Sequence, residues 1–178
     1  RALIGAAVAP NNDNIPTGAA YLFDISNPAA PVVIRRFEPM DGMPLDTFGS
    51  AVALRGDTAL IGATQSDVWG EGSGAAYLFD VNTGQQLSRM IAFDDFNHTG
   101  LGSGVGLVGN IAVLGAVWDD TIGGEAGAVH LFDITDRTAP VLINEFVAPT
   151  TDAHDGFATS VAVEGNTVCK AAAELLEN

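Results

Sequence analysis

The sequence is poor in positive charge. Seven Lys and Arg residues stand against 22 Asp and Glu residues in 178, which gives a formal net charge of −15. A surface of this kind repels phosphate backbones, which argues against nucleic acid and anionic membranes as partners. It favours metal cations, basic partners or simple solubility in a salty medium.

The sequence also has little cysteine and no long apolar run. Cys169 is the single cysteine, so an internal disulfide is excluded and the redox compartment stays open. No signal-peptide pattern and no apolar stretch long enough to span a bilayer occurs within the given residues, and a missing signal says nothing where the N-terminus is itself missing. The chain opens on Arg1 rather than Met, directly before an apolar segment, and we expect it to be a piece of a longer protein.

Catalytic patterns are absent as well. No Ser–His–Asp order and no histidine cluster with ligand spacing occurs, so nucleophilic and zinc chemistry find no support in the sequence. We therefore expect a protein that is not an enzyme.

What the sequence does contain is a repeated unit. The heptad Gly74-Ala-Ala-Tyr-Leu-Phe-Asp80 occurs again at 18–24 and, with two changes, at 127–133. Three more strand-length segments recur with it, at a period of about 53 to 57 residues. These segments are 2–6, 59–63 and 112–116; 48–54, 101–107 and 157–163; and 31–37, 86–93 and 140–146.

Four short apolar segments per unit, separated by turns, predict four antiparallel strands. Two-residue connections such as Gly56-Asp57 and Gly109-Asn110 suit type II′ hairpins. Gly62 and Gly115, near the ends of second strands, predict a close approach of neighbouring backbones. We predict an all-β fold of β-propeller-type blades, with about three repeats present, as part of a larger propeller.

The repeat also predicts the domain boundaries. Residues 1–168 form the blades: a partial blade at 1–47, blades at 48–100 and 101–156, and a partial blade at 157–168. The remaining residues, 169–178, form a divergent tail. So few blades cannot close a ring, because propellers have about four to eight. The missing blades would lie beyond the termini or, alternatively, a homodimer would complete the ring.

Phe48-Gly49, Ile61-Gly62-Ala63 and the heptad, in this order, resemble the FG-GAP repeat of integrin-α-like propellers and their bacterial relatives. The resemblance implies a propeller that is secreted or exposed at the cell surface. In such relatives, calcium is bound by an Asp-x-Asp-x-Asp-Gly loop between the first and second strands. That loop is absent here, so the resemblance carries no calcium ligands over to this chain.

Two sets of loop residues are candidates for binding. Asp119, Asp120 and Glu125 follow a second strand and offer oxygen ligands of the kind that Ca²⁺ prefers, although acidic loops are more often simply solvated. Trp69 and Trp118 occupy corresponding loops and are candidate contacts for a partner, the alternative being that they cap blade interfaces.

The function predicted from these features is a non-catalytic extracellular recognition or adhesion module. Its loop-rich rim would bind a protein or a glycan, with no nucleic acid and no membrane insertion. One alternative is a propeller-based hydrolase or lyase whose site lies in missing blades, and it requires one unit to carry reactive residues that the others lack. The other alternative is a purely structural repeat of a large surface protein.

Overall fold

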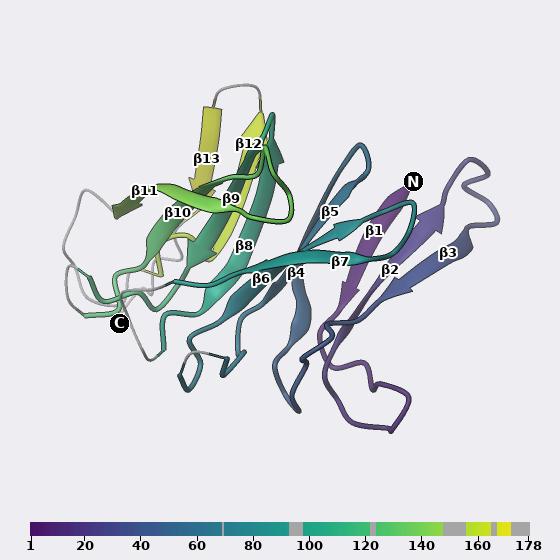
Figure 1. The fold of residues 1–178 in the computed structure, drawn as a ribbon, viewed down its shortest axis with the longest axis horizontal. Coiled ribbons are helices and arrows are strands. Elements are labelled where there is room, and N and C mark those ends of the chain that lie inside the picture. The colour runs from purple at the N-terminus through teal and green to yellow at the C-terminus, as the bar shows by residue number, and fades with distance from the viewer. Residues whose placement is uncertain (69, 93–97, 122–123, 148–155, 165–166, 172–178) are drawn as a thin grey trace, which may run out of the picture.

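The computed structural model describes residues 1–178 except 69, 93–97, 122–123, 148–155, 165–166 and 172–178. In the described residues all regular structure is β-strand (Figure 1). The strands are β1 (Ala2–Ala6), β2 (Ala19–Asp24), β3 (Val32–Phe37), β4 (Phe48–Arg55), β5 (Thr58–Ala63), β6 (Ala75–Asp80), β7 (Gln86–Met90), β8 (Leu101–Val108), β9 (Ile111–Ala116), β10 (Ala128–Asp133), β11 (Val141–Val147), β12 (Ser160–Glu164) and β13 (Thr167–Ala171). No helix in this part of the chain is long and apolar enough to cross a membrane.

The strands form separate antiparallel sheets in chain order. These are β1-β2-β3, β4-β5-β6-β7, β8-β9-β10-β11 and β12-β13, called here the first, second, third and fourth blades. The blades stand side by side and do not close into a ring (Figure 1). The predicted fold class, all-β with four-stranded antiparallel blades, is confirmed.

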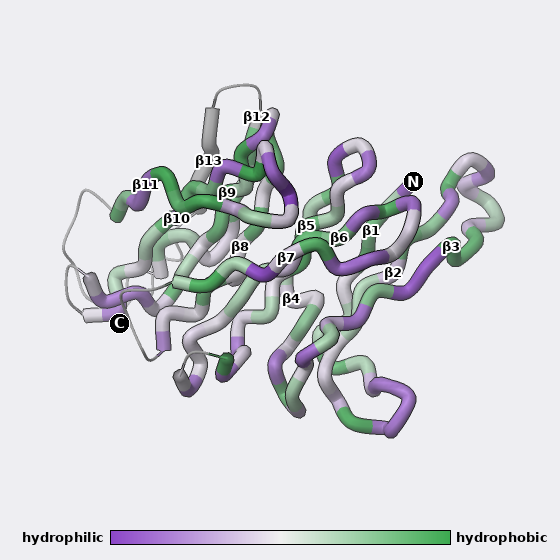
Figure 2. Tube along the Cα trace, in the orientation of Figure 1, coloured by the Kyte–Doolittle hydropathy of each residue, from purple (hydrophilic) through white to green (hydrophobic). Residues whose placement is uncertain are grey.

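The inner strands of the second and third blades are apolar on both faces because a neighbouring blade covers each face. In β5, Ala59 and Ile61 pack toward the first blade, whereas Leu60 packs toward the third. Figure 2 accordingly shows largely hydrophobic backbone through β5, β6 and β9 and hydrophilic stretches at connecting turns. Burial between blades, rather than within one sheet, therefore makes the core.

The first blade has one uncovered face. Ile4, at the position that Ile61 holds in the second blade, is 52% exposed, whereas Ile61 is fully buried. Tyr21 and Phe23 are half-buried on the same strand pair, and their counterparts Tyr77 and Phe79 are buried. The homodimer that would complete a ring stays a prediction.

Adjacent blades touch through glycine backbones. A Cβ atom on Gly62 would lie 2.1 Å from the carbonyl oxygen of Gly102 in the third blade. The same contact joins Gly5 to Gly49, and a Cβ on Gly115 would lie 2.2 Å from the oxygen of Ala158. Real Cβ atoms are excluded at such distances, so the close approach predicted for Gly62 and Gly115 is confirmed. Gly5 makes the same contact at the junction of the first and second blades.

The two-residue turns that join β4 to β5 and β8 to β9 also follow the prediction. Gly56 and Gly109 have φ of 55° and 56°, and neither Asp57 nor Asn110 has positive φ, which is the pattern of a type II′ hairpin. The Arg55 guanidinium donates a hydrogen bond to the Gly109 carbonyl at 2.5 Å, and thus links two hairpins rather than presenting the tripeptide Arg55-Gly56-Asp57 as a free loop.

An aspartate ends β2, β6 and β10, the corresponding strands of the first three blades, and closes the turn that follows each of them. Asp80 Oδ1 accepts hydrogen bonds from the backbone N–H groups of Asn82 and Thr83 at 3.0 and 2.8 Å. Asp24 and Asp133 accept equivalent bonds from the residue two places on. Hydrogen bonds that favour the charged form hold the pKa of each carboxyl below its usual range. The largest contribution comes from the Ser26 N–H at Asp24, from the Thr83 N–H at Asp80 and from the Thr135 side chain at Asp133.

The fourth blade is described only by its first two strands. In β12 and β13, Val163 pairs with Val168 and Ser160 with Ala171, the register of a first and a second strand. Residues 169–171, placed in the divergent tail from the sequence, therefore continue the second strand. The rest of the tail lies outside the described residues.

Gly62→Ala should destabilise the chain by about 3 kcal/mol, because the new methyl group meets the backbone of the next blade and has nowhere to move. Gly56→Ala is the matched control: a Cβ there meets nothing within 4 Å, and only the positive φ of 55° opposes it, at about 1 kcal/mol. Urea denaturation followed by circular dichroism measures both. Equal losses would contradict the role given to this contact.

Candidate functional site

The long loops of every blade emerge at one end of the molecule. In an antiparallel blade, the loop after the second strand and the loop before the next first strand lie at the same end, whereas the short hairpins lie at the other. We call this end the long-loop end. Its described segments are 7–18, 38–47, 64–68, 70–74, 91–92, 98–100, 117–121, 124–127 and 156–159.

Backbone hydrogen bonds join these loops across blade boundaries. Leu45 N donates to Pro16 O at 2.9 Å and Phe48 N to Thr17 O at 3.2 Å, which ties the first blade to the loop entering the second. Gly100 N donates to Gly72 O at 3.1 Å at the next boundary. The loops therefore form one continuous layer rather than independent excursions.

The two tryptophans predicted as partner contacts cannot be compared as a pair. Trp69 lies outside the described residues. Trp118 is half-buried, and its backbone N–H donates to Thr99 O at 3.0 Å. Its ring lies directly over Gly100, where a Cβ would be 2.6 Å from Trp118 Cε3. Trp118 thus packs against the loop that enters its own blade, and a contact role for it stays a prediction.

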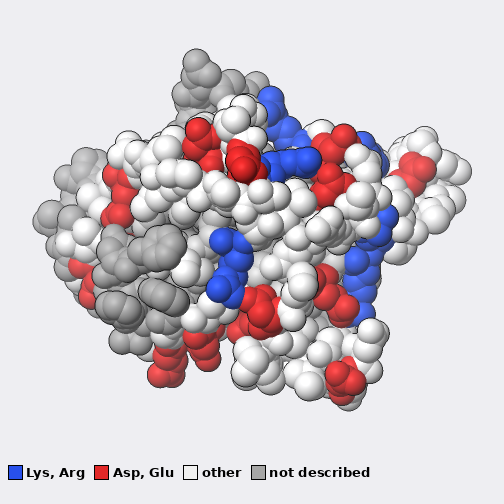
Figure 3. Space-filling model, viewed as in Figure 1, with Lys and Arg blue, Asp and Glu red and all other residues white. Residues whose placement is uncertain are grey.

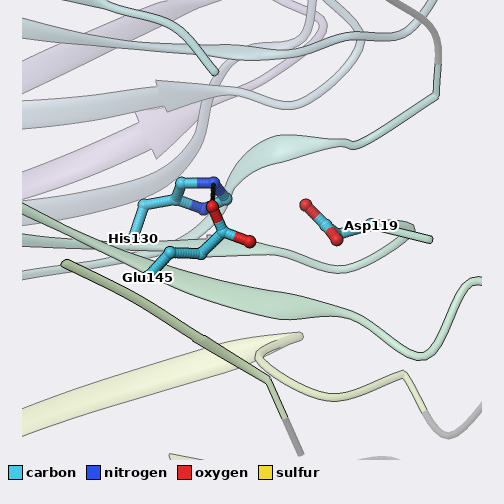
Figure 4. Close-up of side chains that lie close together, drawn as sticks. All are labelled: Asp119, His130 and Glu145. Carbon is cyan, nitrogen blue, oxygen red and sulfur yellow. Dashed lines mark ion pairs between the residues drawn. The ribbon is translucent and has the colours of Figure 1, made fainter. Parts of the chain in front are cut away.

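The three predicted calcium ligands differ in how far their side chains are buried. Asp119 is 2% exposed, whereas Asp120 and Glu125 lie on the exposed surface. Asp119 Oδ1 accepts a hydrogen bond from Thr121 N at 3.0 Å. Its side chain is directed to a different pair of residues, His130 and Glu145, which sequence reasoning did not group with it (Figure 4).

Asp119, His130 and Glu145 form a cluster of potential ligands, the one such group found among the described residues. One ligand atom from each lies within 4.8 Å of the other two. His130 Nε2 and Glu145 Oε2 are 3.4 Å apart. Figure 4 shows both carboxylates near the imidazole, with Asp119 on the loop after β9, His130 on β10 and Glu145 on β11.

The cluster is largely buried, and one residue of the loop after β9 donates hydrogen bonds to both of its carboxylates. The side chain of His130 is 0% exposed and that of Glu145 is 21% exposed. Thr121 contacts both acids: its N–H donates to Asp119 Oδ1, and its hydroxyl donates to Glu145 Oε1 at 3.5 Å. Glu145 forms the more accessible side of the cluster.

The same three places in the other blades hold different chemistry. His130 pairs with Glu145 across the sheet as Tyr77 pairs with Arg89 and as Tyr21 pairs with Arg36. Asp119, Ser66 and Ala9 are equivalent by their backbone bonds. The carbonyl of each accepts from the glycine that precedes the third strand, and the N–H of each donates to the end of the second strand.

In the first two blades these places form a cationic, aromatic set. The Arg36 guanidinium lies over the Tyr21 ring at 5.8 Å and pairs with Glu38 at 2.8 Å. Arg89 pairs with Asp41, and burial raises the pKa of Tyr77. The change to Asp119, His130 and Glu145 is visible in the sequence only when β10, β11 and the loop after β9 are aligned with their counterparts in the other blades. The three residues are 11 and 15 positions apart, so no local pattern groups them.

Elsewhere on the long-loop end, Asp46 is a buried acid with a structural role. Asp46 Oδ2 accepts a hydrogen bond from Met43 N at 2.7 Å, and its carbonyl accepts from Gln65 N at 3.2 Å. Burial raises the pKa of Asp46, and the nearby carboxylates of Asp67 and Asp41 add to the rise. Its counterpart Thr99 is also buried and donates to Ser73 O at 2.6 Å.

The surface charge matches the composition. Figure 3 shows that, in the view of Figure 1, acidic side chains are spread over the surface and basic side chains lie next to some of them. Arg36, Arg89 and Arg137 form ion pairs with Glu38, Asp41 and Asp80.

Comparison with known families gives one match. The description of the matching family is FG-GAP repeat, and the match covers residues 33–79, from β3 to β6. The chain carries an FG-GAP repeat. The match spans the first two strands and the third-strand heptad of the second blade, where the predicted resemblance was placed. FG-GAP repeats are typically extracellular. No curated protein matches the chain.

Asp46→Asn should stabilise the chain more at pH 7 than at pH 4. The folded pKa of Asp46 lies above the unfolded value of about 3.9, so stability is lost as pH rises through the folded pKa, and Asn has no such loss. Asp80→Asn should show the opposite trend, because the Asp80 pKa is lowered. Urea titrations at both pH values measure the differences, and parallel trends for the two variants would contradict this account.

Proposed function

We propose that the chain is an extracellular recognition module, secreted or held at the cell surface, that binds a protein partner at its long-loop end. The observation that carries the proposal is a group of apolar side chains exposed on one loop. Met40, Met43 and Leu45 are 85%, 58% and 64% exposed. We call these three residues the Met40–Leu45 patch.

The loop that carries the patch is held in shape. Leu45 has φ of 71°, a conformation unfavourable for a bulky residue, and its N–H is bonded to Pro16 O. His98, at the same place in the next blade, has φ of 55°, so the turn itself imposes the conformation. A polar residue would satisfy this turn equally well. The exposed leucine is thus not required by the fold.

Exposed apolar groups of this kind mark protein-binding surfaces, and methionine adapts its shape to varied partners. The formal charge of −15 would steer a partner with basic residues toward the chain. Trp118, the described member of the two tryptophans predicted as contacts, is half-buried against Gly100 and offers less exposed surface than the Met40–Leu45 patch. We therefore favour a protein segment with apolar residues flanked by basic ones.

The enzyme alternative gains one observation, since among the three blades whose corresponding places are described only the third carries Asp, His and Glu there, at Asp119, His130 and Glu145. That is the difference between units that this alternative requires. Recognition remains the better-supported function, because Asp119 and His130 are 2% and 0% exposed and a substrate would have little access to them.

A phage-displayed peptide library panned against the immobilised chain provides the probe. Selected peptides should be apolar with basic flanks. The variant Met40→Ser/Met43→Ser/Leu45→Asn should weaken their binding at least about tenfold in a titration by fluorescence anisotropy, because three anchors are truncated together.

The matched control is Val141→Ser/Leu142→Ser/Ile143→Ser, which removes comparably exposed apolar side chains from the outer strand β11. The control should bind the peptides as the parent chain does. Selection of no peptide, or equal losses in both variants, would overturn the proposal.

A further inference from the structure

We propose that Asp119, His130 and Glu145 form a binding site for a first-row divalent transition metal ion of the Zn²⁺ type in the third blade. The inference does not rest on the recognition proposal. It starts from the convergence of one nitrogen and two oxygen ligands from a loop, a central strand and an outer strand (Figure 4).

The spacing of the ligand atoms fits such an ion. Metal–ligand distances of about 2.0–2.2 Å place the ligand atoms of a tetrahedral site about 3.3–3.6 Å apart. His130 Nε2 and Glu145 Oε2 already lie 3.4 Å apart. One oxygen of Asp119 lies within 4.8 Å of a ligand atom of each of the other two residues, so the Asp119 carboxylate would move closer to complete the set.

The ligand types select the metal class. A site with an imidazole and only three protein ligands suits Zn²⁺ and its neighbours, whereas Ca²⁺ prefers six to eight oxygen ligands. Two carboxylates balance the charge of a divalent ion. Thr121 donates to both carboxylates, and such outer hydrogen bonds orient metal ligands in proteins.

The other blades act as internal controls for the site. With the same register and the same backbone bonds, the second blade holds Ser66, Tyr77 and Arg89. Blade packing therefore does not require Asp, His and Glu at these places. All three differ together in the third blade, and each difference introduces a metal ligand where the second blade has an alcohol, a phenol or a cation.

The competing arrangement at these residues is an ion pair between a protonated His130 and Glu145 with no metal bound. The two arrangements differ in a measurable way. The chain, stripped with EDTA and dialysed into metal-free buffer at neutral pH, is titrated with ZnCl₂ by isothermal calorimetry. The expected result is one Zn²⁺ per chain.

Co²⁺ provides a spectroscopic check. Its absorption bands should be those of nitrogen and oxygen ligands, without the thiolate-to-cobalt band that coordination by Cys169 would give. A thiolate band, or Ca²⁺ binding as tight as Zn²⁺ binding, would overturn the assignment of ligands and metal class.

Single variants His130→Gln, Asp119→Asn and Glu145→Gln should each weaken Zn²⁺ binding by at least about tenfold, since even the loss of an outer-shell partner costs 10–100-fold. The exposed acids of the same loop provide the control. Asp120→Asn/Glu125→Gln changes a comparable charge and should alter the affinity less than about twofold, because neither side chain belongs to the cluster.

A triple variant guards against misfolding of the single ones. Asp119→Ser/His130→Tyr/Glu145→Arg installs the set that the second blade carries, and should keep the far-ultraviolet circular dichroism spectrum while abolishing Zn²⁺ binding. Absence of saturable binding by the parent chain would overturn the proposal in favour of the ion pair. So would unchanged Zn²⁺ affinity in the triple variant.

Discussion

The blades are held at their spacing by contact between main chains with no side chain between them. The carbonyl oxygen of Gly102 occupies the space that a Cβ on Gly62 would need, and the junctions at Gly5 and Gly115 repeat the arrangement. Close packing there brings the apolar faces of β5 and β8 together along their length. Phe48, next to Gly49, packs edge-on against Tyr77 and Phe79, with ring centroids 5.5 and 5.9 Å apart. The glycine contact thus sets how closely neighbouring blades approach, and with it the space that the core side chains fill.

Because the glycine contacts fix the blades through their strands, the side chains at the long-loop end can differ from blade to blade. Strand register, hairpin turns and the aspartate-closed turns repeat from blade to blade, so side chains at equivalent places project into equivalent surroundings. Replacing Tyr77 and Arg89 by His130 and Glu145 needs no change in backbone. A repeated scaffold of this kind permits new chemistry in one blade while its neighbours keep the packing role.

Rigid backbone at the loops has a physical origin too. Left-handed φ values recur at Leu45 and His98, and the loop hydrogen bonds that impose them also join neighbouring blades. The energetic cost of such conformations is tolerated only where the surrounding structure determines them. A backbone held in this way loses little conformational freedom when a partner binds, which suits binding.

Most of the architecture could be predicted because it depends on local and repeated signals. Alternating turns and apolar segments specify strands, Gly56 and Gly109 specify hairpins, and the recurrence of Gly62 and Gly115 points to blade contact. The calcium set was predicted from Asp119, Asp120 and Glu125 because they are close in sequence. The structure groups only Asp119 with other ligands, since Asp120 and Glu125 are exposed beyond the cluster.

The sequence by itself determined the strands, their order, the turn types and the repeat, because each depends on neighbouring residues or on a fixed period. Tertiary structure alone decided which side chains meet. Asp119, His130 and Glu145 are brought together by the pairing of β10 with β11 and by the return of the loop after β9, and no local pattern records such pairings. The same is true of Met40, Met43 and Leu45, whose exposure depends on how the loops pack at the blade boundary.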